Sequence, residues 1–230
     1  QGKEDPARLL ERFGLYSASL PKGAIWVHAV SVGEAVGGLS LIEALAERLP
    51  GQTFIITTNT LTAAKLVNDR TTGANMTHLY QPLDHPAFVD RFLEASAPIA
   101  AIFMESDFWP NLIHRTAGRD IPVIFASSQI SDTAAARWRR RPALAAAVFG
   151  TAELVLAVND KQAARLRDLG AHSDIVHRVG SLKLTSGGMK TDPSLMAMLR
   201  QAAGDRHIFL AASTHEDEDL SVIKAAQTLG

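Results

Sequence analysis

The chain has 230 residues, of which 47% are hydrophobic and 20% are charged, and its net charge is −1. This composition supports a buried core and excludes a disordered chain, and the near-zero charge gives no overall attraction to nucleic acid. The absence of cysteine excludes disulfides and thiolate metal sites, and no apolar run approaches the roughly 20 residues of a membrane-spanning helix.

Apolar runs rich in β-formers alternate with helical patterns along the chain. A first strand is predicted at residues 24–30, and apolar residues then recur at helical spacing from 39 to 49, where Pro50 and Gly51 end the helix. Further strands are predicted at 53–58, 77–80, 99–104, 121–126, 154–158, 175–179 and 208–212, and further helices at 62–69, 87–95, 110–117, 160–170 and 216–229.

This alternation predicts an α/β fold with an open, doubly wound, mostly parallel sheet covered by helices on both faces. Residues 185–192 are rich in Gly, Ser, Lys and Thr, which is typical of a linker. A new strand-helix unit starts near Ile208 and cannot form a core alone. We therefore predict a first domain over 1–184, a linker region over 185–206 and the beginning of a second α/β domain over 207–230.

Polar residues follow six of the predicted strands. Ligands of open α/β sheets bind at the carboxyl ends of the strands, so these positions predict one continuous binding edge. Each position alone is weak evidence, because the same residue types also cap helices. The residues are Ser31, Gly33 and Glu34; Thr57, Thr58, Asn59 and Thr60; Glu105 and Asp107; Ser127, Ser128 and Gln129; Asn159; and Ser213, Thr214, His215 and Glu216.

Glu34 stands at the predicted start of the first helix. Its carboxylate could act as a general base in the cleft, or it could simply stabilise the helix N-terminus, which position alone favours. The neighbouring Gly33, Gly37 and Gly38 allow a ligand to approach the backbone, but their spacing differs from that of a dinucleotide-binding loop.

Two acidic residues, Glu105 and Asp107, directly follow the strand at 99–104. They could hold substrate hydroxyls or a cation. Alternatively, Asp107 could cap the helix that begins at Pro110 while Trp109 fills a gap beneath the loop. No further ligands lie nearby at familiar spacing, so we predict no metal site.

Three other groups suit anionic ligands. Arg137, Arg139, Arg140 and Arg141 could meet phosphates of a substrate or of a membrane surface, or form a solvated helix face. The 213–216 segment at a strand-to-helix turn could bind a phosphate or carboxylate, or form a capping box. Lys183 follows another strand and could reach the same cleft.

Together these residues resemble the 3-deoxy-D-manno-octulosonic acid (Kdo) transferase family of lipid A biosynthesis. The segment ending in Val-Gly-Glu34 and the Trp-Pro-Asn-Leu segment are the most specific. The matching segments, in chain order, are residues 3–8, 26–34, Thr57, Thr58 with Thr60, 82–84, 91–93, 105–112, 180–183 and 212–216.

The resemblance implies a two-domain GT-B glycosyltransferase whose Rossmann-like N-terminal domain binds the lipid acceptor and whose C-terminal domain binds CMP-Kdo. Glu34 matches the family's proposed base, and an inverting transfer without metal or cofactor is implied. The resemblance places Ser31, Gly33, Thr57, Thr58, Thr60, Glu105 and Asp107 on the acceptor side, and Lys183, Ser213, Thr214, His215 and Glu216 on the donor side.

The resemblance covers about half of such an enzyme, so we expect the 230 residues alone to be inactive. Family members carry an N-terminal hydrophobic anchor, which implies work at the cytoplasmic face of the bacterial inner membrane. The implied acceptor is a lipid A precursor, lipid IVA. We expect the inner-membrane surface to be a further partner through Arg137, Arg139, Arg140 and Arg141, and the near-zero net charge argues against a nucleic-acid partner. One departure is Gln129, where the family usually has an arginine, and another is Asp107, where it commonly has Glu.

Two alternatives to Kdo transfer stay open. The first is a different GT-B transferase that uses another nucleotide-sugar. The second is a non-catalytic module that holds an anionic lipid in the same cleft.

Overall fold

The computed structural model describes residues 4–70, 75–182, 192–206, 208, 210–215 and 218–229. The chain divides into two compact units, residues 1–187 and residues 188–230. The elements of the first unit, in chain order, are η1 (Pro6–Phe13), β1 (Ile25–His28), α1 (Val32–Arg48), β2 (Phe54–Thr58), α2 (Leu61–Arg70), β3 (Met76–Tyr80), α3 (Pro86–Ser96), β4 (Ala100–Met104), α4 (Pro110–Ala117), β5 (Val123–Ser128), α5 (Asp132–Arg139), α6 (Pro142–Phe149), β6 (Leu154–Ala157), α7 (Asp160–Asp168), η2 (Ser173–Ile175) and β7 (Val176–Arg178).

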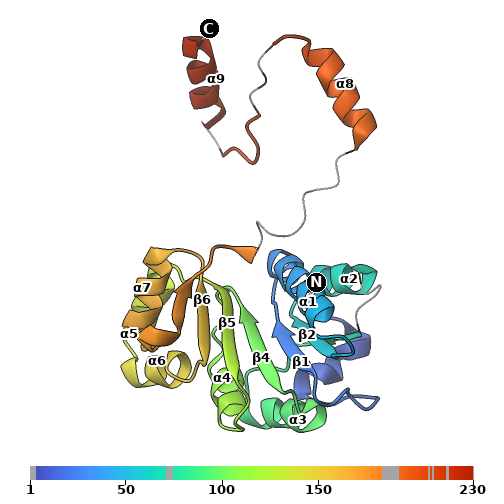
Figure 1. The fold of residues 1–230 in the computed structure, drawn as a ribbon, viewed down its shortest axis with the longest axis vertical. Coiled ribbons are helices and arrows are strands. Elements are labelled where there is room, and N and C mark those ends of the chain that lie inside the picture. The colour runs from blue at the N-terminus through green and yellow to red at the C-terminus, as the bar shows by residue number, and fades with distance from the viewer. Residues whose placement is uncertain are drawn as a thin grey trace. The chain divides into compact units, whose positions relative to one another are not determined.

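The strands form one seven-stranded sheet in the order β3-β2-β1-β4-β5-β6-β7, and all six neighbouring pairs are parallel. Figure 1 shows helices on both faces of this sheet. The predicted open, doubly wound α/β fold is confirmed. Two short helices, α5 and α6, and the 3-10 helix η1 were not predicted from the sequence pattern.

Each face of the sheet buries its own hydrophobic core, because successive side chains of a strand point to opposite faces. Val27 of β1 packs with α1 and α2, whereas its neighbour Trp26 packs with Phe92 of α3 and Phe103 of β4. Both faces are therefore covered, which explains why β1 and β2 are buried at every position.

The order of the strands reverses between β1 and β4. The chain builds β1, β2 and β3 outward in one direction and then returns to place β4 on the other side of β1. The segments that leave β1 and β4 therefore lead to opposite faces of the sheet, to α1 and to α4, and α/β proteins bind ligands at such a reversal of strand order.

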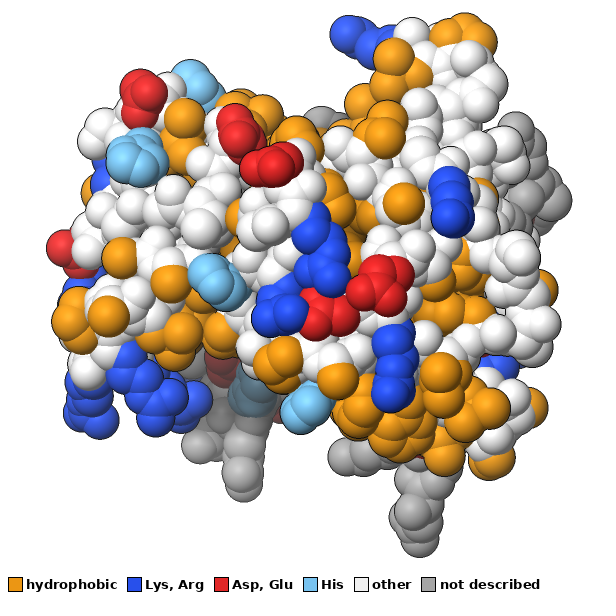
Figure 2. Space-filling model, turned by 90° about the horizontal axis from the view of Figure 1, so that it is seen from below, with side chains coloured by type: hydrophobic (Ala, Val, Ile, Leu, Met, Phe, Trp, Pro, Cys, Tyr) orange, Lys and Arg blue, Asp and Glu red, His pale blue; other side chains and the backbone are white. Residues whose placement is uncertain are grey.

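Ion pairs join the two helices that lie at the lower end of the sheet in Figure 1, α3 and α4. Asp90 of α3 pairs with Arg115 of α4 and with Arg119 in the turn that follows α4, and the Arg119 Nη1–Asp90 Oδ1 distance is 2.7 Å. Figure 2 looks onto this side and shows basic and acidic side chains in contact near its middle. These charges are satisfied within the fold, so they are not free to recruit a ligand.

The second unit contains α8 (Pro193–Ala203) and α9 (Glu218–Leu229). The predicted strand at 208–212 is wrong for the residues that are described there, Ile208 and 210–212, which lie in no strand. A single strand without a neighbour leaves its backbone groups unpaired, so the local β pattern is not enough. Helix α8 occupies part of the predicted linker region, and no helix in the described part of the chain is long and apolar enough to cross a membrane.

We predict that Gly14 is required where η1 ends against α3. Its φ is +70°, and an added Cβ would lie 2.5 Å from the carbonyl oxygen of Phe88. Gly14→Ala should lower the free energy of unfolding by about 2–4 kcal/mol, because a strained left-handed backbone and a clash with backbone add together. The measurement is urea unfolding of the chain followed by circular dichroism.

Gly23→Ala is the matched control. Gly23 has a φ of +72°, and its added Cβ would meet no atom within 4 Å. This variant should lose only about 1–2 kcal/mol of unfolding free energy, which is the cost of placing a residue with a Cβ in the left-handed backbone conformation. Equal losses in the two variants would contradict the predicted contact between Gly14 and α3.

Candidate functional site

Glu34 stands in the first turn of α1, directly after β1. The Ser31 hydroxyl accepts a hydrogen bond from the Glu34 backbone N–H and donates one to Glu34 Oε1 at 3.2 Å, while the backbone N–H of Val30 donates to Oε2 at 2.7 Å. This reciprocal arrangement resembles a capping box and holds the carboxylate in one orientation. Glu34 therefore does stabilise the helix start, and its side chain is nearly buried at 8% exposure.

Asp107 brings a second carboxyl group to Glu34. Burial, a hydrogen bond with Glu34 and the nearby negative charges of Glu34 and Glu105 raise the pKa of Asp107 to about 8. Two carboxyl groups share a hydrogen bond only when one of them carries a proton. The raised pKa keeps a proton on Asp107 at neutral pH, although a backbone hydrogen bond from Val30 lowers the pKa and partly offsets the rise.

Glu105 completes the carboxyl cluster of Glu34, Glu105 and Asp107. Its backbone is left-handed, with a φ of 55°, and its N–H donates to the carbonyl oxygen of Ala126 on β5. The side-chain amide of Gln129 donates to Glu105 Oε2 at 3.0 Å. Gln129 thus keeps a hydrogen bond to this acid without the positive charge that an arginine would add.

The alternative role considered for Asp107, capping α4, is wrong. The N-cap residue of α4 is Trp109, which makes no side-chain capping bond, and the first free N–H groups of the helix donate to another residue, Asp84. Trp109 does pack against the hydrophobic core beneath the loop, as predicted. Asp107 is therefore left to interact with Glu34.

Thr57 and Thr58 are completely buried beneath the edge of the sheet. Thr57 Oγ1 accepts from Trp26 Nε1 at 2.8 Å and bonds His28 Nδ1 at 2.8 Å, and Thr58 Oγ1 bonds His78 Nε2 at 2.9 Å. Their hydroxyl groups are therefore used inside the protein. Thr60 accepts from the N–H of Ala63 and starts α2.

Sequence reasoning missed a polar group under the same edge that is formed by Arg12, His28 and Gln81. Arg12 of η1 donates to the carbonyl oxygen of Gln81 after β3 and to Asn59 after β2. Burial, together with the Arg12 charge, lowers the pKa of His28 to about 3, so His28 is neutral.

Three of the six predicted edge segments meet at the carboxyl cluster, those after β1, β4 and β5, the last through the bond from Gln129 to Glu105. Ser31 and Glu34 come from the first, Glu105 and Asp107 come from the second, and Gly33 lies in the same first turn as Glu34. The segment after β2 and Asn159 after β6 follow strands of the same sheet that do not border the reversal of strand order.

The predicted donor-side residues fall in the second unit or outside the described residues. Ser213, Thr214 and His215 are exposed residues before α9, and the backbone N–H of His215 donates to Glu218 at 2.8 Å. The acid that caps this turn is therefore Glu218, bonded by His215 rather than by Ser213 or Thr214. Lys183 and Glu216 lie outside the described residues.

The carboxyl cluster can accept a proton and hold hydroxyl groups. A carboxylate has about four lone-pair positions, and Glu34 uses three of them for Val30, Ser31 and Asp107, so one position can still accept a hydrogen bond from a ligand. Across the described ranges, no three His, Cys, Asp or Glu side chains are placed to hold a metal ion.

The sequence also matches a known family over most of this domain. The family described as 3-Deoxy-D-manno-octulosonic-acid transferase (kdotransferase) matches residues 7–186. The chain belongs to the Kdo transferase family. The predicted family resemblance is confirmed, and the matched region contains the whole seven-stranded sheet and the carboxyl cluster.

Curated relatives in this family come from bacteria and a plant. The 3-deoxy-D-manno-octulosonic acid transferase of Haemophilus influenzae is 32% identical over 228 residues, covering 96% of this chain and 52% of the relative. The Bordetella pertussis protein of the same name is 32% identical over 235 residues, and a probable mitochondrial one from Arabidopsis thaliana is 29% identical over 225. The chain spans about half the length of these relatives.

Solved structures share the fold at low sequence identity. The UDP-GlcNAc 2-epimerase of Neisseria meningitidis, bound to UDP-GlcNAc, superimposes with a TM-score of 0.59 at 13% identity and covers 89% of this chain and 62% of its own. The MnaA-UDP structure from S. aureus gives 0.54 at 13% identity, covering 76% of this chain and 51% of its own. These likenesses support the Rossmann-like fold alone.

The raised pKa of Asp107 predicts a pH-dependent stability. The Asp107 carboxyl binds its proton more tightly in the folded state than in the unfolded state. Its favourable contribution to the free energy of unfolding is therefore complete below pH 3.8 and is lost as the pH rises toward about 8. Asp107→Asn cannot ionise, so its free energy of unfolding should rise relative to that of the natural protein as the pH is raised from 5 to 8. The expected gain exceeds about 1 kcal/mol, since one pKa unit corresponds to about 1.4 kcal/mol.

Urea unfolding at both pH values measures this difference. Asp69→Asn on the exposed end of α2 is the control and should show no such change. A gain for Asp107→Asn that is the same at pH 5 and pH 8 would contradict a shared proton between Asp107 and Glu34.

Proposed function

We propose that this protein transfers Kdo from CMP-Kdo to a lipid A precursor, lipid IVA, during lipopolysaccharide biosynthesis, with inversion at the anomeric carbon. Membership of the Kdo transferase family supports the transfer of Kdo. The observation that carries the mechanism is the position of Glu34 at the point where strand order reverses, held by Ser31 and Val30 beside a protonated Asp107.

Glu34 is the general base in this proposal. A hydroxyl group of the acceptor sugar gives its proton to Glu34 while its oxygen bonds to the anomeric carbon of Kdo, and the bond from that carbon to the CMP phosphate oxygen breaks. The fixed orientation of Glu34 is important because base and donor must be held in line across the cleft. The two hydrogen bonds from Val30 and Ser31 provide that orientation.

Glu105 and Asp107 bind acceptor hydroxyl groups in this proposal. Kdo and CMP are both anionic, so three ionised carboxylates in the site would repel the donor. A protonated Asp107 removes one of these charges and can donate a hydrogen bond. Gln129 donates a hydrogen bond to Glu105 Oε2 and so orients this carboxylate, which we assign to the binding of acceptor hydroxyl groups.

The residues that we assign to binding of the donor follow the seven-stranded sheet in the sequence. We assign Lys183, Ser213, Thr214, His215 and Glu216 to CMP-Kdo because hydroxyl groups, cations and a helix start suit a phosphate or a carboxylate. The acceptor is a lipid, so the reaction takes place at the cytoplasmic face of the inner membrane. We propose that it needs neither a metal ion nor a cofactor.

Glu34→Gln should reduce turnover by about 10²–10⁴-fold, since that is the usual contribution of a general base. The amide keeps the oxygen that accepts from Val30, so binding of the acceptor should be retained. The assay follows Kdo transfer from CMP-Kdo to lipid IVA by the full-length natural protein that contains these residues, with UDP-GlcNAc as an alternative donor.

Glu43→Gln on the same helix is the matched control and should keep full activity, because Glu43 is exposed. Unchanged turnover in Glu34→Gln would refute the assignment of the base. Transfer from UDP-GlcNAc in preference to CMP-Kdo would refute the proposed donor.

Treatment with EDTA should leave the rate of Kdo transfer unchanged if no metal takes part. The rate is measured on the same full-length protein before and after dialysis against the chelator, and again after Mg²⁺ is added back. A loss of activity that Mg²⁺ restores would show that a cation assists departure of CMP.

A further inference from the structure

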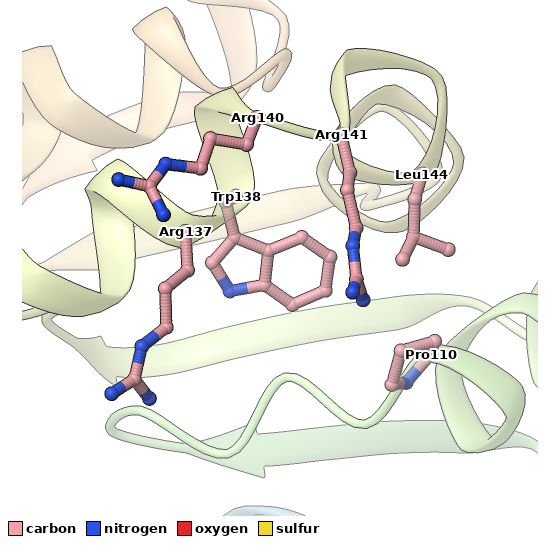
Figure 3. A pocket seen from close by; sticks show the side chains of 6 residues that line it. All are labelled: Pro110, Arg137, Trp138, Arg140, Arg141 and Leu144. Atoms are coloured by element: carbon pink, nitrogen blue, oxygen red, sulfur yellow. The ribbon is translucent and has the colours of Figure 1, made fainter.

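A basic pocket of about 370 Å³ lies where α5 ends and α6 begins. It is lined by Arg137, Trp138, Arg140, Arg141, Leu144 and, from α4, Pro110. Figure 3 shows the indole of Trp138 between the side chains of Arg137 and Arg141, with Leu144 beside Arg141. We call this region, together with the outer side of α6, the α5–α6 surface.

Three of the arginines here are not neutralised by the protein. Arg139, on the same helix, pairs with Asp168 at 2.7 Å, but Arg137, Arg140 and Arg141 have no ion-pair partner among the residues the structure describes. The chain as a whole has a net charge of −1, so this is a local concentration of uncompensated positive charge. Guanidinium groups arranged in this way match the oxygens of a phosphate.

Trp138 gives the pocket a rigid aromatic wall. Its ring meets that of Phe149 edge-on, with ring centroids 5.2 Å apart, and it packs against the hydrophobic core. Tryptophan is favoured where one side of a ring is apolar and the other meets water or lipid headgroups.

The outer side of α6 is apolar although it is exposed. Ala145, Val148 and Phe149 are buried against the core, whereas Pro142, Ala143, Leu144 and Ala146 face outward, and Leu144 is 36% exposed. A surface helix normally presents polar residues on its outer side. An exposed apolar helix side bordered by unpaired arginines is typical of a protein surface that lies in a membrane interface.

We propose that the α5–α6 surface binds an anionic phospholipid bilayer, with a headgroup phosphate bound by Arg137 and Arg141 in the pocket beside Trp138. The outer side of α6 then lies at the boundary between headgroups and acyl chains. The apolar side favours a lipid over a free phosphate or a nucleic acid, because neither of those would bury it. The inference deepens the proposed function by naming the surface that faces the membrane, and its test requires no transfer.

The test is flotation of the 230-residue chain with vesicles of phosphatidylcholine alone or with added phosphatidylglycerol. Binding should need phosphatidylglycerol and should weaken as salt is raised. The double variant Arg137→Gln/Arg141→Gln should bind about 30-fold more weakly, since each arginine near an anionic surface contributes about 1 kcal/mol and tenfold equals about 1.4 kcal/mol.

Two further variants make the test specific. Arg139→Gln removes one charge from α5, the helix that carries Arg137, and should bind nearly as well as the natural chain because its guanidinium is already paired. Leu144→Asp should weaken vesicle binding by placing a charge on the apolar side. Circular dichroism and urea unfolding confirm that each of these exposed substitutions leaves the fold intact.

Three outcomes would overturn the inference. They are equal binding to both kinds of vesicle, equal losses in Arg139→Gln and the double variant, and displacement of the chain from vesicles by inorganic phosphate or a single-stranded oligonucleotide at comparable charge concentration. The proposed function fails separately, if vesicle binding is present but the full-length protein transfers no Kdo to lipid IVA presented in detergent.

Discussion

The pairing of β4 with β1 is the constraint on which the site depends. The two strands are parallel neighbours although β2, β3 and three helices separate them in the chain. Their carboxyl ends therefore meet, and the segments that leave them place Glu34 beside Asp107 and Glu105. Without this return of the chain the three acids would lie at separate places, and no group of them would share a proton.

The Glu34 side chain has both a structural role at the start of α1 and a proposed role as the general base. A glutamate in the first turn of a helix stabilises the helix dipole and its free N–H groups, and the bonds to Val30 and Ser31 show that Glu34 does this. The same bonds fix the carboxylate of this nearly buried side chain. Capping and catalysis are therefore not competing explanations, because the capping bonds supply the orientation that a base requires.

The charged side chains of the first unit are compensated in different ways in different places. Between α3 and α4, Asp90 neutralises two arginines. Under the sheet edge, Arg12 bonds to carbonyl and amide oxygens, and burial together with the Arg12 charge lowers the pKa of His28. In the carboxyl cluster, a proton on Asp107 limits the negative charge. At the α5–α6 surface, neighbouring arginines line a pocket beside an exposed apolar helix side, and that combination is what suggests a bilayer as partner.

The sequence by itself determined the alternation of strands and helices, the parallel sheet and the family, because these follow from local periodicity and from contiguous motifs such as the segment ending at Glu34. It also indicated which strand ends are polar. Only the tertiary structure decided that Thr57 and Thr58 are buried, that Asp84 rather than Asp107 caps α4, and that Arg12 lies under the site. The reason is physical: burial, pKa and hydrogen-bond partners depend on residues that are distant in sequence, and strand order alone brings those residues together.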